Sequence, residues 1–153
     1  MILTQPMKIF LFISAFTLMA CQTLKPQILR QGLSGYVYRQ SGNQIPSPNR
    51  KPRKSKGIKC DLYIYKPTTL KQTLGSSPVF TSVNNKLVII VHSDSTGYYA
   101  VKLPAGKYSV FIRTDDQSFF ADESDSNGIL NPAEVTAHKV TLRNFTLRLG
   151  AVY

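Results

Sequence analysis

Hydrophobic and polar residues alternate along most of this chain with the period of two that is typical of β-strands. The alternation is clearest in residues 33–39, 98–103 and 108–113, and turn-forming residues separate the last two segments. No segment keeps helical spacing over more than two turns. Several short strands joined by turns favour an antiparallel sandwich, so we expect an all-β fold with little helix.

Four further segments are expected to be strands, namely residues 58–65, 86–92, 134–137 and 140–149. Residues 87–91 are apolar on both faces, which favours a central place in a sheet. A shift of phase at Asn144–Phe145 predicts a bulge, and Gly35 marks a bulge or a close approach of two backbones. Residues 67–82, which Pro78 interrupts, are expected to form a loop.

Charge is distributed unevenly along the chain, whose formal net charge is +11. The insertion 40–57 is rich in Pro, Gly, Ser and Asn, and in and just after it lies a basic run of Arg50, Lys51, Arg53, Lys54, Lys56 and Lys59. Most of the acids crowd a second stretch, at Asp115, Asp116, Asp122, Glu123 and Asp125. Two interpretations stay open: solvated loops of opposite sign that face each other, or a basic surface for lipid headgroups or acidic glycans. No aromatic residue interleaves the basic run, so we expect no nucleic-acid partner.

The N-terminal region has the layout of a secretory signal, with Lys8 ahead of the apolar run 9–20. That run is too short to span a membrane, which takes about 20 residues. Met7 is an alternative start to Met1. Leu18-Met19-Ala20-Cys21 is similar to the lipobox of bacterial lipoproteins. This resemblance implies that residues 1–20 are removed and that Cys21 is lipidated, whereas the alternative is a buried helix with an incidental cysteine.

We therefore expect a lipoprotein signal peptide at 1–20, a lipid-anchored tether at 21–32 and a β-sandwich at 33–150. The tether carries no acidic run. In lipoproteins of Bacteroidota-like bacteria such a run accompanies surface export, and its absence favours a periplasm-facing place at the outer membrane. Cys60 is the second of the two cysteines, and we expect it to be a buried small hydrophobe rather than a reactive thiol.

Three motifs together resemble the carboxypeptidase regulatory-like domain: the opening Gly35-Tyr36-Val37, D-x-x-G-x-Y from Asp94 and L-P-x-G-x-Y from Leu103. The chain is similar, more narrowly, to small lipoproteins of Bacteroidota. The resemblance covers about residues 33–149. It implies a single antiparallel, seven-stranded, transthyretin-like (prealbumin-like) sandwich. Gly97 and Gly106 are then expected at left-handed turn positions.

We expect no catalysis and no cofactor. The enzymatic branch of the superfamily, the hydroxyisourate hydrolases, uses histidines, an arginine and a C-terminal Tyr-Arg-Gly-Ser, whereas this chain ends Gly-Ala-Val-Tyr. His92 and His138 have no evident nucleophile or orienting acid nearby in the sequence. The expected function is that of a non-catalytic cell-envelope lipoprotein, a structural or accessory interaction module. Its expected partners are the membrane, through the lipid anchor, and an envelope protein or glycan.

Two further features suggest ligands. Tyr36, Tyr38, Tyr63 and Tyr65 could form a tyrosine-rich sheet face that binds a glycan or peptide, or they could serve only sheet packing. The spacing of Glu123, Asp125, Asn127 and Glu134, with Gly128 between them, is that of an EF-hand calcium loop. Because acids, Asn and Gly are also what exposed turns prefer, an ordinary loop is the alternative.

Overall fold

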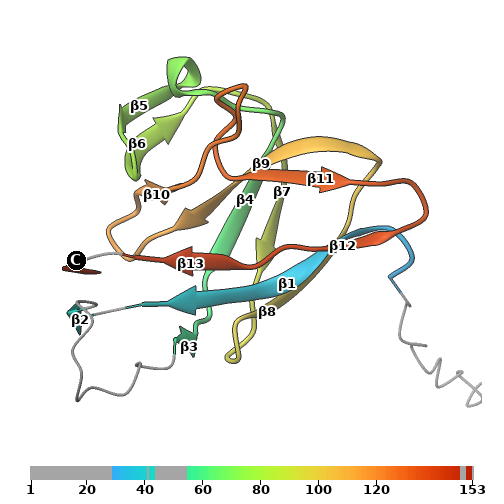
Figure 1. Cartoon of the computed structure of the whole chain (residues 1–153), viewed down its shortest axis with the longest axis horizontal. Helices are drawn as coiled ribbons and strands as arrows, with labels where there is room; N and C mark the ends of the chain where they lie inside the picture. The colour runs from blue at the N-terminus through green and yellow to red at the C-terminus, as the bar shows by residue number, and fades with distance from the viewer. Residues whose placement is uncertain (1–28, 41, 44–54, 149–150, 153) are drawn as a thin grey trace, which may run out of the picture.

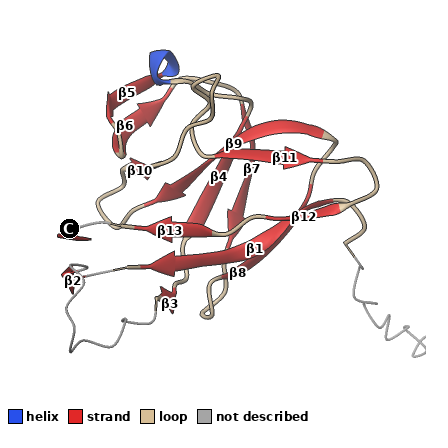
Figure 2. Cartoon of the chain, in the orientation of Figure 1, coloured by secondary structure: helices blue, strands red, loops and turns tan. Residues whose placement is uncertain are grey.

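The alternating segments of the sequence form strands that pair into two main sheets (Figure 1). The structure is a computed structural model that describes residues 29–40, 42–43, 55–148 and 151–152. In chain order its elements are β1 (Gly32–Arg39), β2 (Gly42–Asn43), β3 (Lys56–Gly57), β4 (Asp61–Tyr65), the short 3-10 helix η1 (Leu70–Gln72), β5 (Thr73–Ser76), β6 (Val79–Val83), β7 (Leu87–His92), β8 (Tyr98–Lys102), β9 (Gly106–Arg113), β10 (Phe119–Phe120), β11 (Pro132–Val135), β12 (Val140–Leu142), β13 (Phe145–Leu147) and β14 (Ala151–Val152). The described residues are thus almost entirely strands and loops, as Figure 2 shows.

β1 is the central strand of a five-stranded sheet. Along one edge it pairs antiparallel with β8 and then with β3. Along the other edge it pairs in parallel with β12 and then with β13, so the expectation of a purely antiparallel sandwich is wrong for this sheet. Parallel neighbours need a long connection, and most of the domain lies between β1 and β12.

The second sheet has seven strands in the order β5-β6-β10-β9-β4-β7, and β11 also pairs with β9. All its pairs are antiparallel. The expectation of a loop at 67–82 is wrong, because this stretch contains η1, β5 and β6. Phe80 explains the difference: it is fully buried and packs edge-on against Phe111, and such packing overrides a turn-rich composition.

β7 lies at an edge of the second sheet and pairs only with β4 there, so the prediction of a central strand is wrong. Leu87, Ile89 and Ile90 on this strand are 40%, 40% and 39% exposed. Val88 and Val91 nevertheless both pack on the core. The register shift between β4 and β7 interrupts the alternation, so Val88 and Val91 face the core together although they are three residues apart. The apolar residues on both faces therefore reflect this shift and not a central place in the sheet.

The main core lies between the two sheets and takes side chains from both, as in a β-sandwich. β9 contributes Tyr108, Val110 and Ile112 to it, all at most 2% exposed, as the alternation predicted. The opposite face of β9 is also covered, by a second cluster of Tyr65, Phe80, Phe111, Phe119, Ala121 and Leu130. Each large apolar side chain buried in this way stabilises the fold by about 1.5–3 kcal/mol.

The strand predicted at 140–149 is interrupted at Arg143 and Asn144, where the sequence predicted a bulge. The Asn144 side chain there accepts a hydrogen bond from the backbone N–H of Tyr36 at 2.9 Å. The close approach expected at Gly35 is confirmed, because a Cβ on this residue would lie 2.0 Å from the carbonyl oxygen of Arg143.

Gly97 and Gly106 have φ of +87° and +148°, the positive values expected for both turns. Among the residues that the structure describes, no helix is long and apolar enough to cross a membrane.

Candidate functional site

β1 and β13 both end on the left of Figure 1, and residues at these and other strand ends line a pocket. β1 ends there with Arg39, β9 with Arg113 and β13 with Leu147. The pocket has a volume of about 310 Å³ and is lined by Arg39, Lys56, Gly57, Ile58, Lys59, Cys60, Ser95, Arg113, Asp115 and Leu147. This volume is at the lower end of the range of small-molecule sites, roughly 300–1,000 Å³.

Positive charge dominates the pocket lining, with four basic side chains and one carboxylate. Arg39 donates to the Asp115 carboxylate at 3.0 Å, and the Asp115 side chain is 89% exposed. Lys56, Lys59 and Arg113 form no ion pair with any residue in the described part of the chain. An exposed pair such as Arg39–Asp115 contributes little to stability, about 0–1 kcal/mol. This pair therefore does not explain why four basic side chains line the same pocket.

Arg113 is held in place by neutral partners. Its Nε and one terminal nitrogen both donate to the side-chain oxygen of Gln117, at 3.2 and 3.0 Å. Its guanidinium lies 4.4 Å from the ring centroid of Phe119 and 5.6 Å from that of Tyr63. These contacts fix the planar group without neutralising it, and a fixed arginine loses little freedom when it binds an anion.

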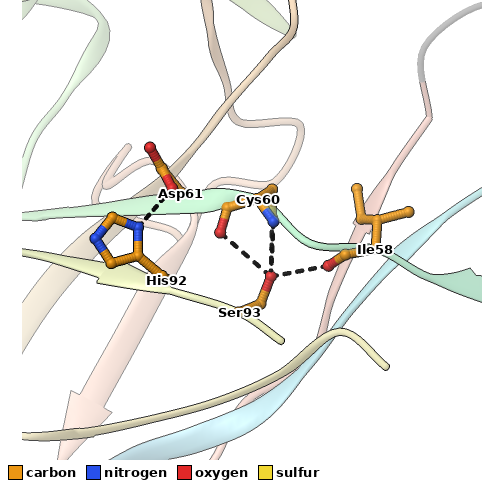
Figure 3. A network of polar contacts seen from close by, with 5 residues as sticks. All are labelled: Ile58, Cys60, Asp61, His92 and Ser93. Carbon is orange, nitrogen blue, oxygen red and sulfur yellow. Dashed lines mark hydrogen bonds and ion pairs between the residues drawn. The ribbon is translucent and has the colours of Figure 1, made fainter. Parts of the chain in front are cut away.

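Ile58, Lys59 and Cys60 form one wall of the pocket. Ser93 holds the first and last of these residues through hydrogen bonds (Figure 3). Its hydroxyl accepts the backbone N–H of Cys60 at 2.9 Å and donates to the carbonyl of Ile58 at 2.8 Å. Its own N–H donates to the carbonyl of Cys60 at 3.0 Å. The strand expected at 58–65 begins only at Asp61. The N–H of Ile58 donates to the carbonyl of Val37 on β1 and that of Cys60 to the Ser93 side chain, so residues 58–60 do not continue the pairing of β4 with β7 and β9.

Cys60 is partly buried and packs on the main core, while its sulfur also contacts the Ser93 hydroxyl at 3.4 Å. Burial raises the pKa of the Cys60 thiol above its usual 9.0 and Asp61 raises it further, whereas the Ser93 hydrogen bond and Arg39 act in the opposite direction. A thiol with a raised pKa is mostly protonated at neutral pH and is a weak nucleophile. These properties fit the buried small hydrophobe that the sequence predicted.

His92 lies beside this wall but is engaged elsewhere. Its Nδ1 is 2.6 Å from the Asp61 carboxylate, and both side chains are largely exposed. His138 is exposed in a turn, with φ of +59°. In the residues that the structure describes, no three His, Cys, Asp or Glu side chains lie together in a way that could hold a metal ion.

The four predicted ligand tyrosines do not share one face. Tyr36 and Tyr38 stack at 6.0 Å on β1, in the first sheet, and the Tyr98 ring lies 5.4 Å from that of Tyr36. Tyr63 and Tyr65 belong to β4, in the second sheet, and point into the second cluster. Tyr65 is only 6% exposed, because it packs in one cluster with Phe80 of β6, Phe111 of β9 and Phe119 of β10, so it offers no ligand surface.

Several other predicted site residues lie outside the described residues, namely Cys21, Arg50, Lys51, Arg53 and Lys54. Lys56 and Lys59, at the C-terminal end of the basic run, line the pocket. Two acids of the second stretch pair with arginines outside the basic run, Glu123 with Arg143 and Asp122 with Arg148, both at 2.5 Å. Asp115, from the same stretch, lines the pocket together with Lys56 and Lys59. Most of the basic run lies outside the described residues, so both interpretations of the two charged stretches stay predictions.

The calcium-loop hypothesis does not agree with the geometry. Asp125 instead closes a turn, accepting the backbone N–H groups of Asn127 and Ile129 at 2.9 and 2.8 Å. Glu123 pairs with Arg143, and Glu134 lies on β11 opposite Lys107. The carboxylates are thus distributed over a turn, an ion pair and a strand, as expected for the ordinary loop that was the alternative.

Sequence reasoning missed Arg39, Arg113 and Asp115 as parts of one site. Their common signal is that each lies at or just after the last residue of an alternating segment. Which strand ends meet depends on sheet topology, which the alternation does not encode. Comparison with known proteins found no matching family model, no matching curated protein and no matching solved structure.

Proposed function

We propose that this chain is a non-catalytic lipoprotein of the cell envelope, anchored through Cys21, whose β-sandwich serves as an accessory interaction module. The observation that carries the proposal is the position of the pocket relative to the start of β1. The described chain enters β1 at Gly32, and β1 runs from right to left in Figure 1. Arg39, at the far end of this strand, lines the pocket. At about 3.3 Å per residue, β1 separates the two ends by roughly 25 Å.

This separation suits a protein that is anchored at one end and binds at the other. A lipid on Cys21 would place the start of β1 toward the membrane. The pocket would then be presented to the compartment that the protein faces, which we propose is the periplasmic side of the outer membrane. The tether 21–32 adds reach of up to about 40 Å when it is extended.

The chemistry around the pocket favours binding over catalysis. Ser93 is 2% exposed and donates its hydroxyl proton to a backbone carbonyl. The Cys60 thiol has a raised pKa, and the imidazole of His92 is paired with Asp61 rather than with either of them. An activated nucleophile needs a base within hydrogen-bond reach, and neither hydroxyl nor thiol has one in this arrangement.

The two turns of the named motifs support the proposed likeness to carboxypeptidase regulatory-like domains. Asp94 accepts the Thr96 hydroxyl at 2.6 Å and the Tyr98 N–H at 3.0 Å, which closes the D-x-x-G turn. In the L-P-x-G-x-Y turn, the Tyr108 hydroxyl donates to the carbonyl of Pro104 at 2.8 Å. Asp94 and Tyr108 thus each stabilise the turn of their own motif. The seven-stranded, transthyretin-like arrangement remains part of this proposal.

Membrane fractionation of cells that express the full chain tests the anchor. We expect the wild-type protein in the membrane fraction and Cys21→Ser in the soluble fraction or as an uncleaved precursor. Cys60→Ser is the matched control, because it removes the other thiol and should stay in the membrane. Membrane association of Cys21→Ser equal to that of the wild type would contradict the proposal.

A second candidate function is glycan or peptide binding on the first sheet. It is favoured by the cluster of Tyr36, Tyr38 and Tyr98, in which Tyr36 is 37% and Tyr98 42% exposed. Exposed aromatic faces are suited to stacking against sugars or apolar side chains. A glycan array should show binding that Tyr36→Ala and Tyr98→Ala abolish and that Tyr63→Ala leaves in place, whereas unchanged binding in the first two variants would rule this surface out.

A further inference from the structure

The pocket at the end of β1 keeps a surplus of positive charge that the described protein does not neutralise. Among the described residues of the lining, Asp115 is the only carboxylate, and it pairs with Arg39. The other cations of the lining, Lys56, Lys59 and Arg113, have no acidic partner in the described ranges. Cations gathered around one concave space repel one another, and an anion bound between them offsets this repulsion because it attracts each of them.

The cations are carried by strands or by fixed backbone. Arg39 ends β1, which is the central strand of its sheet, and Arg113 ends β9. Lys56 belongs to β3, opposite Arg39 in the pairing. Lys59 follows on the segment that Ser93 holds through hydrogen bonds to Ile58 and Cys60. A site that exists before the ligand arrives loses less entropy on binding, so this placement favours recognition.

The combination of ligand groups indicates the class of anion. Two guanidinium groups and two ammonium groups suit an anion with several oxygen atoms and more than one charge, for which phosphate is the common biological choice. The volume of about 310 Å³ exceeds what a bare phosphate fills. The exposed Asp115 carboxylate and the Ser95 hydroxyl can accept hydrogen bonds from the hydroxyl groups of an attached polyol.

We propose that this pocket binds the phosphate ester of a polyol, such as a sugar phosphate or a glycerophosphate headgroup. The phosphate lies among Arg39, Lys56, Lys59 and Arg113, and the polyol hydroxyls face Asp115. This inference deepens the proposed binding role, but it does not depend on acylation of Cys21. Failure of the fractionation experiment and failure of the binding experiment below are therefore distinguishable.

Isothermal titration calorimetry on the full chain, purified in a neutral detergent, tests the proposal. The probes are glucose 1-phosphate, inorganic phosphate and glucose. We expect saturable 1:1 binding of glucose 1-phosphate that is tighter than that of inorganic phosphate, no binding of glucose, and an affinity that falls with added salt. Equal affinity for glucose 1-phosphate and inorganic phosphate would overturn the assignment to a polyol ester, and absence of saturable binding at millimolar glucose 1-phosphate would overturn the site.

A matched pair of double variants shows whether the pocket is responsible. Lys56→Gln/Lys59→Gln removes two charges from the lining, and Lys102→Gln/Lys107→Gln removes two from exposed positions on β8 and β9 that do not line the pocket. We expect the first pair to weaken the affinity by at least about tenfold, since charged hydrogen bonds contribute on this scale, and the second to change it less than about twofold. Equal losses would show unspecific attraction and contradict the proposal.

The Cys60 thiol supplies an independent readout, because Cys60 is one of the residues that line the pocket. Bound glucose 1-phosphate should slow its alkylation, followed by the mass of the peptide that carries Cys60, in the wild type but not in Lys56→Gln/Lys59→Gln. An unchanged alkylation rate with saturating glucose 1-phosphate would contradict binding in this pocket. Far-UV circular dichroism melts establish that each variant is folded before its affinity is compared.

The same assay distinguishes two sources of the phosphate ester. Full chain reconstituted in phosphatidylglycerol vesicles is compared with full chain in phosphatidylcholine vesicles, with glucose 1-phosphate added to both. Weaker glucose 1-phosphate binding in phosphatidylglycerol indicates a lipid headgroup as the ligand, and equal binding indicates a soluble or glycan-borne phosphate. Both outcomes support the shared chemistry, whereas loss of glucose 1-phosphate binding in both vesicles would overturn it.

Discussion

Ser93→Ala tests whether one buried hydroxyl fixes the pocket wall. The residue is 2% exposed, and its Oγ accepts the N–H of Cys60 at 2.9 Å and donates to the carbonyl of Ile58 at 2.8 Å. The substitution deletes a single oxygen and leaves both backbone groups without this partner. The Ser93 N–H bond to the Cys60 carbonyl is retained, so the chain path should persist.

The expected loss of stability follows from the hydrogen bonds. A hydrogen bond contributes about 0.5–1.5 kcal/mol net, and a buried group left without a partner costs about 1–3 kcal/mol. Ile58 and Cys60 are only partly buried, so water can partly replace Ser93 as the partner of the Ile58 carbonyl and the Cys60 N–H. We therefore expect the free energy of unfolding of Ser93→Ala to fall by about 2 kcal/mol, between the two limits.

Urea unfolding of the full chain in neutral detergent measures this difference. The chain has no Trp, so far-UV circular dichroism is the suitable signal. Ser95→Ala is the matched control, since it deletes the same atom from an exposed residue of the same pocket, and its effect should stay within about 0.5 kcal/mol. A Ser93→Ala variant as stable as the wild type, or a Ser95→Ala variant equally destabilised, would refute the reasoning.

Three further predictions concern the close approach, the first turn and the thiol. Gly35→Ala places a Cβ 2.0 Å from the carbonyl oxygen of Arg143, and overpacking of this kind costs about 1–3 kcal/mol, so an unchanged urea midpoint would contradict the geometry. The Thr96 hydrogen bond lowers the pKa of Asp94 below its usual 3.8; stability from this carboxylate is therefore present above that value and lost as the pH falls through the lowered pKa. Asp94→Asn should reduce this acid-side fall of the melting temperature, and an unaltered pH profile would exclude the effect. Burial raises the pKa of Cys60, so its alkylation at pH 8 should be slower than that of free glutathione and increase only above 9.0; equal rates at pH 8 would disagree with this. The same shift means that the contribution of the thiol to stability is complete below 9.0 and is lost as the pH rises through the raised pKa.

Local patterns in the sequence predicted those parts of the fold that depend on local geometry. The alternation in β9 placed Tyr108, Val110 and Ile112 on one buried face, and the positions of Gly97 and Gly106 indicated turns with positive φ. Gly35 predicted a close approach because no side chain fits there. In each case a residue and its near neighbours in the sequence contain the whole signal.

Features that depend on distant contacts could not be predicted in the same way. β7 is apolar on both faces yet lies at an edge, because a register shift against β4 lets Val88 and Val91 both reach the core. β6 is a strand because Phe80 packs against Phe111 on the second sheet. The predicted tyrosine face divides between two sheets because β1 and β4 do not pair with each other.

The pocket illustrates the same limit for the candidate site. The basic run pointed to Lys56 as part of a surface for anions, and Lys56 does line the pocket. Arg39 and Arg113 join it only because β1 and β9 end at the same end of the sandwich. Their side chains appear in the sequence as isolated charges after alternating strands, so no local signal links them.

The anchor at Cys21 is the central claim of this account, and mass spectrometry of the N-terminal peptide from cell membranes tests it most directly. The account predicts a mature chain that begins at residue 21 and carries a thioether-linked diacylglycerol on the cysteine sulfur. A mature protein that retains residues 1–20, or that begins with an unmodified Cys21, would contradict it.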